Sequence, residues 1–247
     1  MIPARKVSWF NRWFVGVIRR RLESQFQFVH VHGRARLDAL ANEPILVVSN
    51  HTSWWDPLVA VWVTSHVIRT NAYALMNGAN LRRLPFFRLL GAFGVDLDRA
   101  GDGARGIRYA ARLLREPRTW VWVYAQGDER PVTERPLSFK PGAAAIARLA
   151  PQAKVLPIAL RYEFGNTERP ELRIRVGEAL SSTGDIERDR LAQEEAVTDL
   201  LEAIDSDLST GLRPSDHELF HRFKPGWWQR LAEWWLVRLT RGNVPKP

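Results

Sequence analysis

The segment around which this chain is organised reads Pro44-Ile45-Leu46-Val47-Val48-Ser49-Asn50-His51-Thr52-Ser53-Trp54-Trp55-Asp56-Pro57. Its first half is a short, β-branched apolar run, which predicts a buried strand. Ser53 and Asp56 resemble a capping box with Asp in place of Glu, and Pro57 falls where the first turn of a helix tolerates proline. The segment therefore predicts a strand, a turn and the start of a helix, with His51 in the turn.

This placement puts His51 at the carboxyl edge of a sheet, where open α/β folds bind their ligands. Asp56 follows five positions later, in the first turn of the helix, from which its carboxylate can reach back to the imidazole. A histidine held by a carboxylate is the arrangement that a general base needs. The same spacing also fits a structural interpretation, in which Asp56 caps the helix and His51 is an ordinary turn residue.

The rest of the chain alternates strand-like and helix-like segments. Apolar runs predict strands at 26–32, 67–75, 91–99, 119–124, 155–160 and 172–176, and Asn77-Gly78 predicts a turn. Helical spacing of apolar residues predicts helices at 7–22, 104–115, 143–149 and 185–208. In the last helix the residues expected to point inward are Leu191, Val197, Leu200, Leu201, Ile204 and Leu208. This order predicts an α/β fold with a mostly parallel, mixed sheet covered by helices on both faces.

Length and composition fit one α/β core of 247 residues, or one core with a small appendage. The chain has no cysteine, which rules out a disulfide framework, a thiolate nucleophile and a cysteine metal site, and which fits a cytoplasmic location. No apolar run reaches the roughly 18 residues that a membrane-spanning helix needs. The first residues lack the pattern of a signal peptide.

The net charge of +9 and the 11 tryptophans are the unusual features of the composition. A basic chain suggests an anionic partner, either nucleic acid or an acidic membrane surface. The tryptophans at the two ends lie among arginines and lysines, a composition typical of helices that lie in the lipid headgroup layer. Those residues are Trp9, Trp13, Trp227, Trp228, Trp234 and Trp235. We therefore expect a membrane surface with anionic lipid as partner, and no nucleic acid.

Arg105, Arg108, Arg112 and Arg115 fall near one face of the helix predicted at 104–115. A solvated helix face is the simpler interpretation of such a row, and an anion-binding face is the alternative.

Taken together, four ordered blocks resemble the glycerolipid (lysophosphatidic acid) acyltransferase family, which carries a His-x4-Asp motif. The blocks are Asn50 to Pro57, Gly91 to Arg99, Tyr124 to Arg130, and Val155 to Ile158. Phe139-Lys140-Pro141-Gly142 also sits where the family has a Lys/Gly turn before a helix, and the resemblance covers roughly residues 40–180. It implies a glycerol-3-phosphate acyltransferase-like core, which we place at 25–212. The Trp/Arg composition of the ends predicts an amphipathic interface helix at 1–24 and a Trp/Arg-rich amphipathic segment at 213–247.

The third block departs from the family's Phe-Pro-Glu-Gly-Thr-Arg-Ser. Gln126 stands in place of its Glu and Ala125 in place of its Pro, and Arg130 lies one position beyond the usual Arg, which aligns with Glu129. Glutamine keeps a hydrogen-bonding carbonyl but loses the negative charge. The acceptor can therefore differ from lysophosphatidic acid.

By this resemblance, His51 deprotonates an acceptor hydroxyl and Asp56 orients the imidazole. The hydroxyl then attacks the thioester of acyl-CoA or acyl carrier protein, with no metal and no cofactor. The resemblance implies substrate contacts from Arg99, Gln126, Gly127, Arg130 and Lys140. For Arg99 and Arg130, the alternative is a surface ion pair with Asp96, Asp98 or Asp128.

Three classes of function follow. The first is a peripheral acyltransferase on the cytoplasmic face of the membrane, which makes phospholipid from a lysophospholipid. The second transfers the acyl group to another hydroxyl, such as that of a glycolipid, a carotenoid glycoside or a lyso-ornithine lipid. The third is a non-catalytic lipid-binding or nucleic-acid-binding protein. The intact His51 and Asp56 argue against the lipid-binding version, and the Trp-rich ends argue against the nucleic-acid version.

Overall fold

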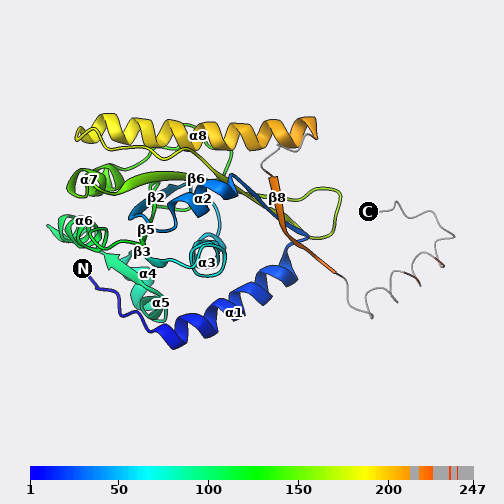
Figure 1. Cartoon of the computed structure of the whole chain (residues 1–247), viewed down its shortest axis with the longest axis horizontal. Helices are drawn as coiled ribbons and strands as arrows, with labels where there is room; N and C mark the ends of the chain where they lie inside the picture. The colour runs from blue at the N-terminus through cyan, green and yellow to red at the C-terminus, as the bar shows by residue number, and fades with distance from the viewer. Residues whose placement is uncertain (212–216, 225–233, 235–237, 239–247) are drawn as a thin grey trace.

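The computed structural model describes residues 1–211, 217–224, 234 and 238. Its centre is an eight-stranded sheet in the order β4-β3-β5-β2-β6-β7-β1-β8 (Figure 1). The strands are β1 (Phe28–His32), β2 (Ile45–Ser49), β3 (Asn71–Asn77), β4 (Ala92–Val95), β5 (Thr119–Tyr124), β6 (Lys154–Glu163), β7 (Glu171–Val176) and β8 (His217–Arg222). Helices flank this mixed, mostly parallel sheet, which confirms the predicted α/β fold class.

Five neighbouring strands, β4, β3, β5, β2 and β6, run parallel to one another. β7 is antiparallel to β6, β1 is parallel to β7, and β8 is antiparallel to β1. Since β2 and β5 are paired and parallel, their carboxyl ends lie side by side at one edge. The turn after β2 and the loop after β5 therefore meet at that edge.

Two layers of helices cover the sheet. The core on one face includes residues of α1 (Ser8–Gln25), α2 (Arg34–Leu40), α3 (Asp56–Trp62), α4 (Gly78–Arg83) and α5 (Phe87–Leu90). The core on the other face includes residues of α6 (Asp102–Leu113), α7 (Gly142–Leu149) and α8 (Ile186–Thr210). Alternate residues of β2 belong to the two cores, as expected for a strand buried on both faces.

Helix α1 has one face in the core and one in solvent. Ile18 and Leu22 are buried, and the rest of that face packs against α3 and α5. Trp9 and Trp13 point outward and are 66% and 59% exposed. The predicted amphipathic helix is confirmed, and its outer face leaves two tryptophans uncovered.

The structure differs from the sequence expectations in the region after α3. The helix continues as a π-helical turn, η1 (Val63–Val67), so β3 begins at Asn71 and not at Val67. Asn77-Gly78 was expected to form a turn. Instead, the Asn77 side chain caps α4 by accepting hydrogen bonds from the backbone N–H groups of Ala79 and Asn80, at 2.9 and 3.3 Å.

Other expectations concern the outer faces of α8 and α6. Leu191 was predicted to point inward from α8 but is 52% exposed, whereas Val197, Leu201 and Ile204 are buried. The four arginines of the predicted row, three on α6 and Arg115 just beyond its end, are all exposed, and Arg105 pairs with Asp102 at 2.8 Å. This agrees with the simpler interpretation of a solvated helix face.

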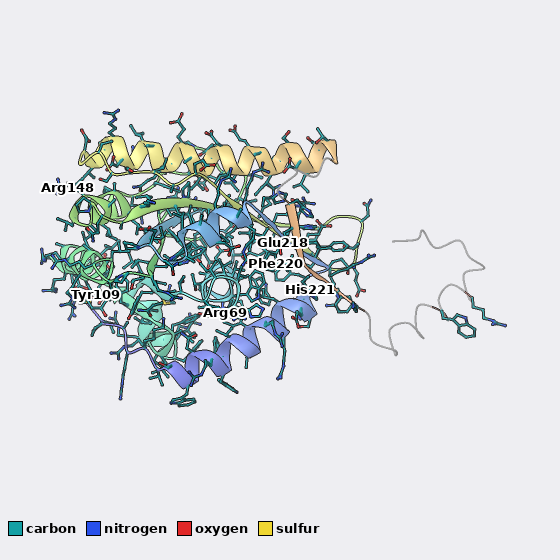
Figure 2. The ribbon with its side chains drawn as sticks, viewed as in Figure 1. Arg69, Tyr109, Arg148, Glu218, Phe220 and His221 are labelled. Atoms are coloured by element: carbon teal, nitrogen blue, oxygen red, sulfur yellow. The ribbon has the colours of Figure 1, made fainter. Side chains whose placement is uncertain are left out.

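The expected C-terminal segment at 213–247 lies mostly outside the described residues. Its described part includes β8, which forms an edge strand beside β1 and carries Glu218, Phe220 and His221 (Figure 2). In the part of the chain that the structure describes, none of the helices is both long and apolar enough to cross a bilayer.

Candidate active site

The turn that carries His51 is anchored to the sheet before it begins. The Asn50 side chain, at the end of β2, donates from Nδ2 to the carbonyl of Leu160 at 2.9 Å. Its Oδ1 accepts from the N–H of Leu160 at 2.8 Å. This buried two-way bond replaces the backbone pairing with β6 that ends at Ser49. The position of the next residue, His51, is fixed as a result.

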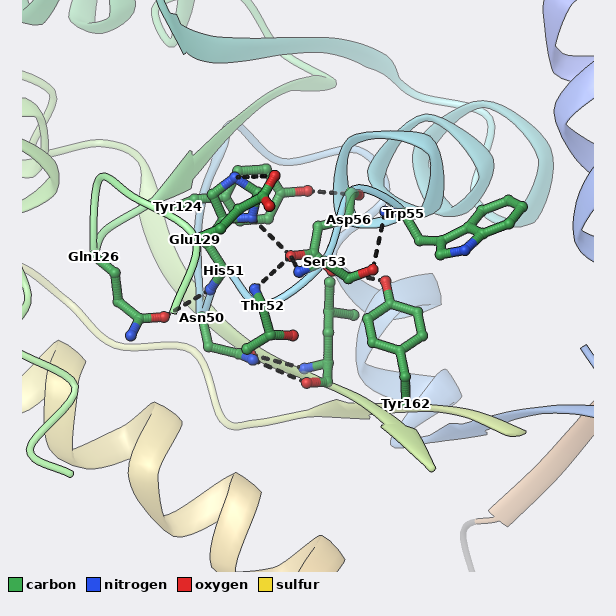
Figure 3. Close-up of polar contacts among 11 residues, drawn as sticks. Asn50, His51, Thr52, Ser53, Trp55, Asp56, Tyr124, Gln126, Glu129 and Tyr162 are labelled. Carbon is green, nitrogen blue, oxygen red and sulfur yellow. Dashed lines mark hydrogen bonds and ion pairs between the residues drawn. The ribbon is translucent and has the colours of Figure 1, made fainter. Parts of the chain in front are cut away.

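His51 and Asp56 form a hydrogen-bonded dyad (Figure 3). Nδ1 of His51 lies 2.7 Å from Oδ2 of Asp56, and the Asp56 side chain is fully buried. The same Oδ2 accepts from the N–H groups of Thr52 and Ser53 at 2.7 and 3.0 Å. Because these bonds fix the carboxylate, Nδ1 of His51 is held and Nε2 is the ring nitrogen left to face a substrate.

Only half of the expected capping box forms. Asp56 accepts from the N–H of Ser53, as a capping box requires of its acidic residue. The Ser53 hydroxyl accepts from the N–H of Trp55 at 3.2 Å and not from that of Asp56. The helix begins at Asp56, with Pro57 in its first turn. Asp56 therefore serves both the helix start and the histidine.

Two partly buried tyrosines support the dyad, and the sequence did not identify them as site residues. Tyr162 donates its hydroxyl to Oδ1 of Asp56 at 2.7 Å, and Tyr124 donates to the Asp56 carbonyl at 2.6 Å. The Tyr124 ring is stacked on the His51 ring with 4.5 Å between centroids. Burial, and then the nearby charge of Asp56, raise the pKa of both phenols well above the ordinary value. Both hydroxyls therefore stay protonated as donors.

The loop after β5 is bonded directly to the histidine turn. The N–H of His51 donates to Oε1 of Gln126 at 2.7 Å, and the carbonyl of His51 accepts from the N–H of Arg130 at 2.9 Å. Gln126 is 1% exposed. Its side chain therefore acts within the protein, holding the backbone of His51. Contact between Gln126 and an acceptor, which the resemblance implied, stays a prediction.

Glu129 is a further residue that the sequence did not single out for the site. Its Oε1 lies 3.9 Å from Nε2 of His51, the side of the ring that faces away from Asp56. The Glu129 side chain is 56% exposed and lines the cavity beside His51. A carboxylate therefore stands next to the nitrogen at which a substrate hydroxyl would bind.

The structure places the other expected substrate residues around this loop. Gly127 and Lys140 line the cavity, and the Lys140 ammonium lies 3.0 Å from Asp128. Gly127 has φ of 82°, a left-handed conformation that favours glycine, and a Cβ there would lie 2.5 Å from the Lys140 ammonium, which would have to shift.

The two expected arginines lie outside the cavity lining. Arg130 pairs with Glu134 at 2.9 Å, and not with Asp128. Arg99 is exposed in the loop after β4, where Asp96 pairs with Arg82 at 2.8 Å. Substrate contact by either arginine stays a prediction.

His51 opens into a cavity of about 890 Å³ with mostly apolar walls. The walls come from both sides of the sheet. Met76 and Trp122 belong to the core that includes α1 to α5, and Leu75 and Val123 to the core that includes α6 to α8. This volume is at the upper end of the range for small-molecule sites.

A gap in the sheet lets the cavity reach both faces. β3 and β5 pair only over 71–74 and 119–122. Beyond these residues β3 pairs with β4 alone and β5 with β2 alone. The cavity occupies the space where the two strands part, next to Tyr124 and His51.

In metal sites without cysteine, acidic and histidine side chains converge on the ion. Within the described ranges, no group of three or more His, Cys, Asp or Glu residues is placed to hold an ion.

Residues 28–161, more than half of the chain, match the model of a protein family described as "Acyltransferase". The match spans β1 to Arg161, near the end of β6, and includes the dyad, the loop after β5 and the gap in the sheet. The chain belongs to this acyltransferase family. The resemblance to the glycerolipid (lysophosphatidic acid) acyltransferases is therefore confirmed, and the protein is an enzyme that transfers acyl groups. A comparison with curated proteins found no significant match.

Within the acyltransferase, the dyad, the two tyrosines and the cavity form one unit. Asp56 and Tyr124 each contact His51, Tyr162 contacts Asp56, and the cavity begins at the His51 ring. The arrangement can accept a proton at Nε2 and can hold an apolar chain beside it.

Proposed function

We propose that this acyltransferase moves a fatty acyl group from a thioester, acyl-CoA or acyl carrier protein, to the hydroxyl of a single-chain membrane lipid. The observation that carries the proposal is the dyad at the mouth of a large apolar cavity. Nδ1 of His51 is bound to Asp56 at 2.7 Å, and its ring lines the same cavity as Trp54 and Met76. A base next to a chain-sized apolar space suits a lipid substrate.

The reaction needs one base and no covalent enzyme intermediate. Nε2 of His51 takes the proton of the acceptor hydroxyl while its oxygen attacks the thioester carbonyl. The carbon–sulfur bond then breaks, and the thiol leaves with the proton that the imidazolium returns. Asp56 stabilises the imidazolium while it exists. Its four hydrogen bonds, from His51, Thr52, Ser53 and Tyr162, keep the carboxylate in place through both proton transfers.

We further propose that the enzyme works at the surface of an anionic membrane, on its cytoplasmic face. The outward Trp9 and Trp13 of α1 lie on the same helix as the exposed Arg12, Arg19 and Arg20. Aromatic side chains favour the headgroup layer, and cations favour acidic lipid. A lipid acceptor then leaves the bilayer only partway to reach His51.

A lysophospholipid is the acceptor that the family suggests. A glycolipid, a carotenoid glycoside or a lyso-ornithine lipid is the second candidate. The observation that favours the second candidate is the altered loop, in which Gln126 is turned inward onto His51 and Glu129 lies at Nε2.

Acyl transfer by the wild type and by His51→Ala, with acyl-CoA and with acyl carrier protein, tests the proposal. Release of the thiol and mass spectrometry of the lipid product would measure it over a panel of single-chain acceptors. We expect the substitution to abolish turnover, because a general base contributes about 10²–10⁴-fold to the rate. We expect the protein to remain folded. Transfer within about tenfold of wild type in folded His51→Ala protein would remove His51 as the base.

A further inference from the structure

The carboxylate of Glu129 lies beside the place where a reacting hydroxyl must bind. Asp56 holds Nδ1 of His51, so the acceptor hydroxyl donates to Nε2, at about 3 Å in an ordinary hydrogen bond. Glu129 Oε1 is 3.9 Å from that same nitrogen. Whatever substituent the acceptor carries next to its hydroxyl therefore lies close to a negative charge.

The loop holds Glu129 there through its backbone. Gln126, three residues before, accepts from the N–H of His51 at 2.7 Å, and Arg130, one residue after, donates its N–H to the His51 carbonyl at 2.9 Å. The N–H of Lys140 donates to the carbonyl of Ala125 at 2.7 Å at the base of the loop. Glu129 is thus placed between two points fixed to the histidine itself (Figure 3).

The cations on either side of Glu129 are committed to other acids. Lys140 pairs with Asp128 at 3.0 Å, and Arg130 pairs with Glu134 at 2.9 Å. Both pairs neutralise the cation that would otherwise offset the charge of Glu129. The charged group that faces Nε2 is therefore the carboxylate of Glu129, in a protein whose net charge is +9.

A phosphate next to the hydroxyl is poorly suited to this field. Its oxygens would lie within about 4 Å of the hydroxyl oxygen, given ordinary bond lengths. Two like charges at that range are inside the Debye length of about 8 Å, so salt screens them incompletely. An anionic group further along the acceptor has a cation available, because Arg83 of α4 lines the same cavity.

We propose that Glu129 selects an acceptor whose hydroxyl neighbours a hydrogen-bond donor that is not anionic, an ammonium or a second hydroxyl. The carboxylate accepts a hydrogen bond from that donor and so turns the reacting hydroxyl toward Nε2 of His51. Glu129 is a specificity residue in this role, and His51 remains the base. The inference rests on the proposed acyl transfer and narrows its acceptor.

Three matched acceptors test it. Each is an alkyl glycerol ether with the same chain and the same reacting hydroxyl, and the neighbouring carbon carries phosphate, hydroxyl or ammonium. The ether link prevents the chain from migrating. For the wild type we expect kcat/KM for the ammonium and hydroxyl acceptors to exceed that for the phosphate acceptor by about tenfold or more. The reason is that a phosphate close to the Glu129 carboxylate is repelled by it. The ammonium and hydroxyl arms separate charge attraction from hydrogen bonding.

Two substitutions and one control complete the experiment. Glu129→Gln, which keeps the size of the side chain, should reduce the ratio of kcat/KM for the ammonium or hydroxyl acceptor to that for the phosphate acceptor. Glu129→Arg should reverse the preference in favour of the phosphate acceptor. Glu116→Gln removes one charge from an exposed acid that does not line the cavity, and should leave the ranking as it is. A wild type that prefers the phosphate acceptor, or a ranking that Glu129→Gln leaves unchanged, would overturn the proposal.

Binding measured without turnover separates this proposal from the proposed function. Calorimetric titration of the three ethers into His51→Ala protein, with and without Glu129→Gln, reports selection at Glu129 alone. If wild-type enzyme transfers to none of the three while this binding order holds, the proposed function fails and the role of Glu129 stands. Equal binding of the three ethers, with transfer observed, overturns the role of Glu129 only.

Discussion

The hydroxyl of Tyr162 donates to Oδ1 of Asp56 across 2.7 Å, although the two residues are 106 positions apart. Tyr162 lies near the end of β6, so the carboxylate that holds His51 is itself held by the sheet. The dyad is therefore a product of the whole parallel core and not of the His-x4-Asp turn alone.

We expect Tyr162→Phe to lower kcat about tenfold and to change KM little, because it removes one of the hydrogen bonds that fix the carboxylate. A hydrogen bond to a charged group contributes about 1.5–3 kcal/mol, and the free energy of unfolding should fall by an amount in that range. Steady-state kinetics and urea unfolding measure the two effects. Tyr109→Phe, on α6, is the control and should match the wild type in both.

We expect Asp56→Asn to fold but to lose about a hundredfold or more in kcat, within the usual range for a base whose partner is lost. The amide oxygen can take the bonds from Thr52, Ser53 and His51, and the amide nitrogen can donate to the Tyr162 hydroxyl, which turns to accept. Only the charge that stabilises the imidazolium is lost. A variant that unfolds, or one with near wild-type kcat, would contradict this account.

Gln126 is expected to act through the backbone of His51. Gln126→Ala removes the acceptor of a buried N–H, a loss that costs about 1–3 kcal/mol, so stability and kcat should fall together. Gln126→Glu restores the acceptor but buries a charge. The departure of Gln126 from the family pattern predicts a change in acceptor preference, whereas its buried contact with His51 predicts a clear loss of stability as well. Thermal unfolding and the acceptor panel compare the two.

The free energy of unfolding should depend on pH through the ionisation of Lys6. Its ammonium donates to Oδ1 of Asn71 and to the carbonyl of Ala72, and burial lowers its pKa from 10.5 to about 8. Between these values the unfolded chain binds more protons than the folded one, so stability rises with pH, by up to about 1.4 kcal/mol per pH unit. The stability gained in this range is lost as the pH falls to about 8, where Lys6 is protonated in the folded protein as well. Urea unfolding from pH 7 to 10.5 should show this slope in the wild type and not in Lys6→Met.

Replacement of Trp9 and Trp13 by Ser should reduce flotation with anionic vesicles and activity on a vesicle-borne acceptor together, while sparing activity on a soluble short-chain one. Added salt should weaken the binding that remains, since arginines then supply it. Phe164→Ser, at an equally exposed site between β6 and β7, is the control. Unchanged flotation of the double variant would mean that α1 does not form the membrane contact.

Local patterns predicted the elements whose signals are local. β5 was expected at 119–124 and is found there, because an unbroken β-branched and aromatic run has no helical interpretation. The arginine row of α6 and the amphipathic α1 were also read from spacing. Asn77-Gly78 shows the limit, because the same dipeptide serves a turn or a helix cap, and the following residues decide which.

The sequence predicted the His51–Asp56 motif of the site but not the residues that hold this pair in place. His51 and Asp56 are five positions apart, so their contact follows from one turn. Tyr124, Tyr162 and Glu129 reach the dyad from other strands and loops, and no local pattern marks such contacts. Gln126 was recognised as a departure from the family, but its inward direction depends on the pairing of β2 with β5.

The parting of β3 from β5 has a mechanical consequence. β2 pairs over five residues with each of its neighbours, whereas β3 is joined to β5 over four and then continues beside β4 alone. The β3–β4 edge, with α4 and α5, is therefore joined to the rest of the parallel sheet through a four-residue pairing. If this edge moved outward, the cavity would widen while the pairs of β2 that position His51 stayed intact, so a bulky chain could be admitted without disturbing the catalytic residues.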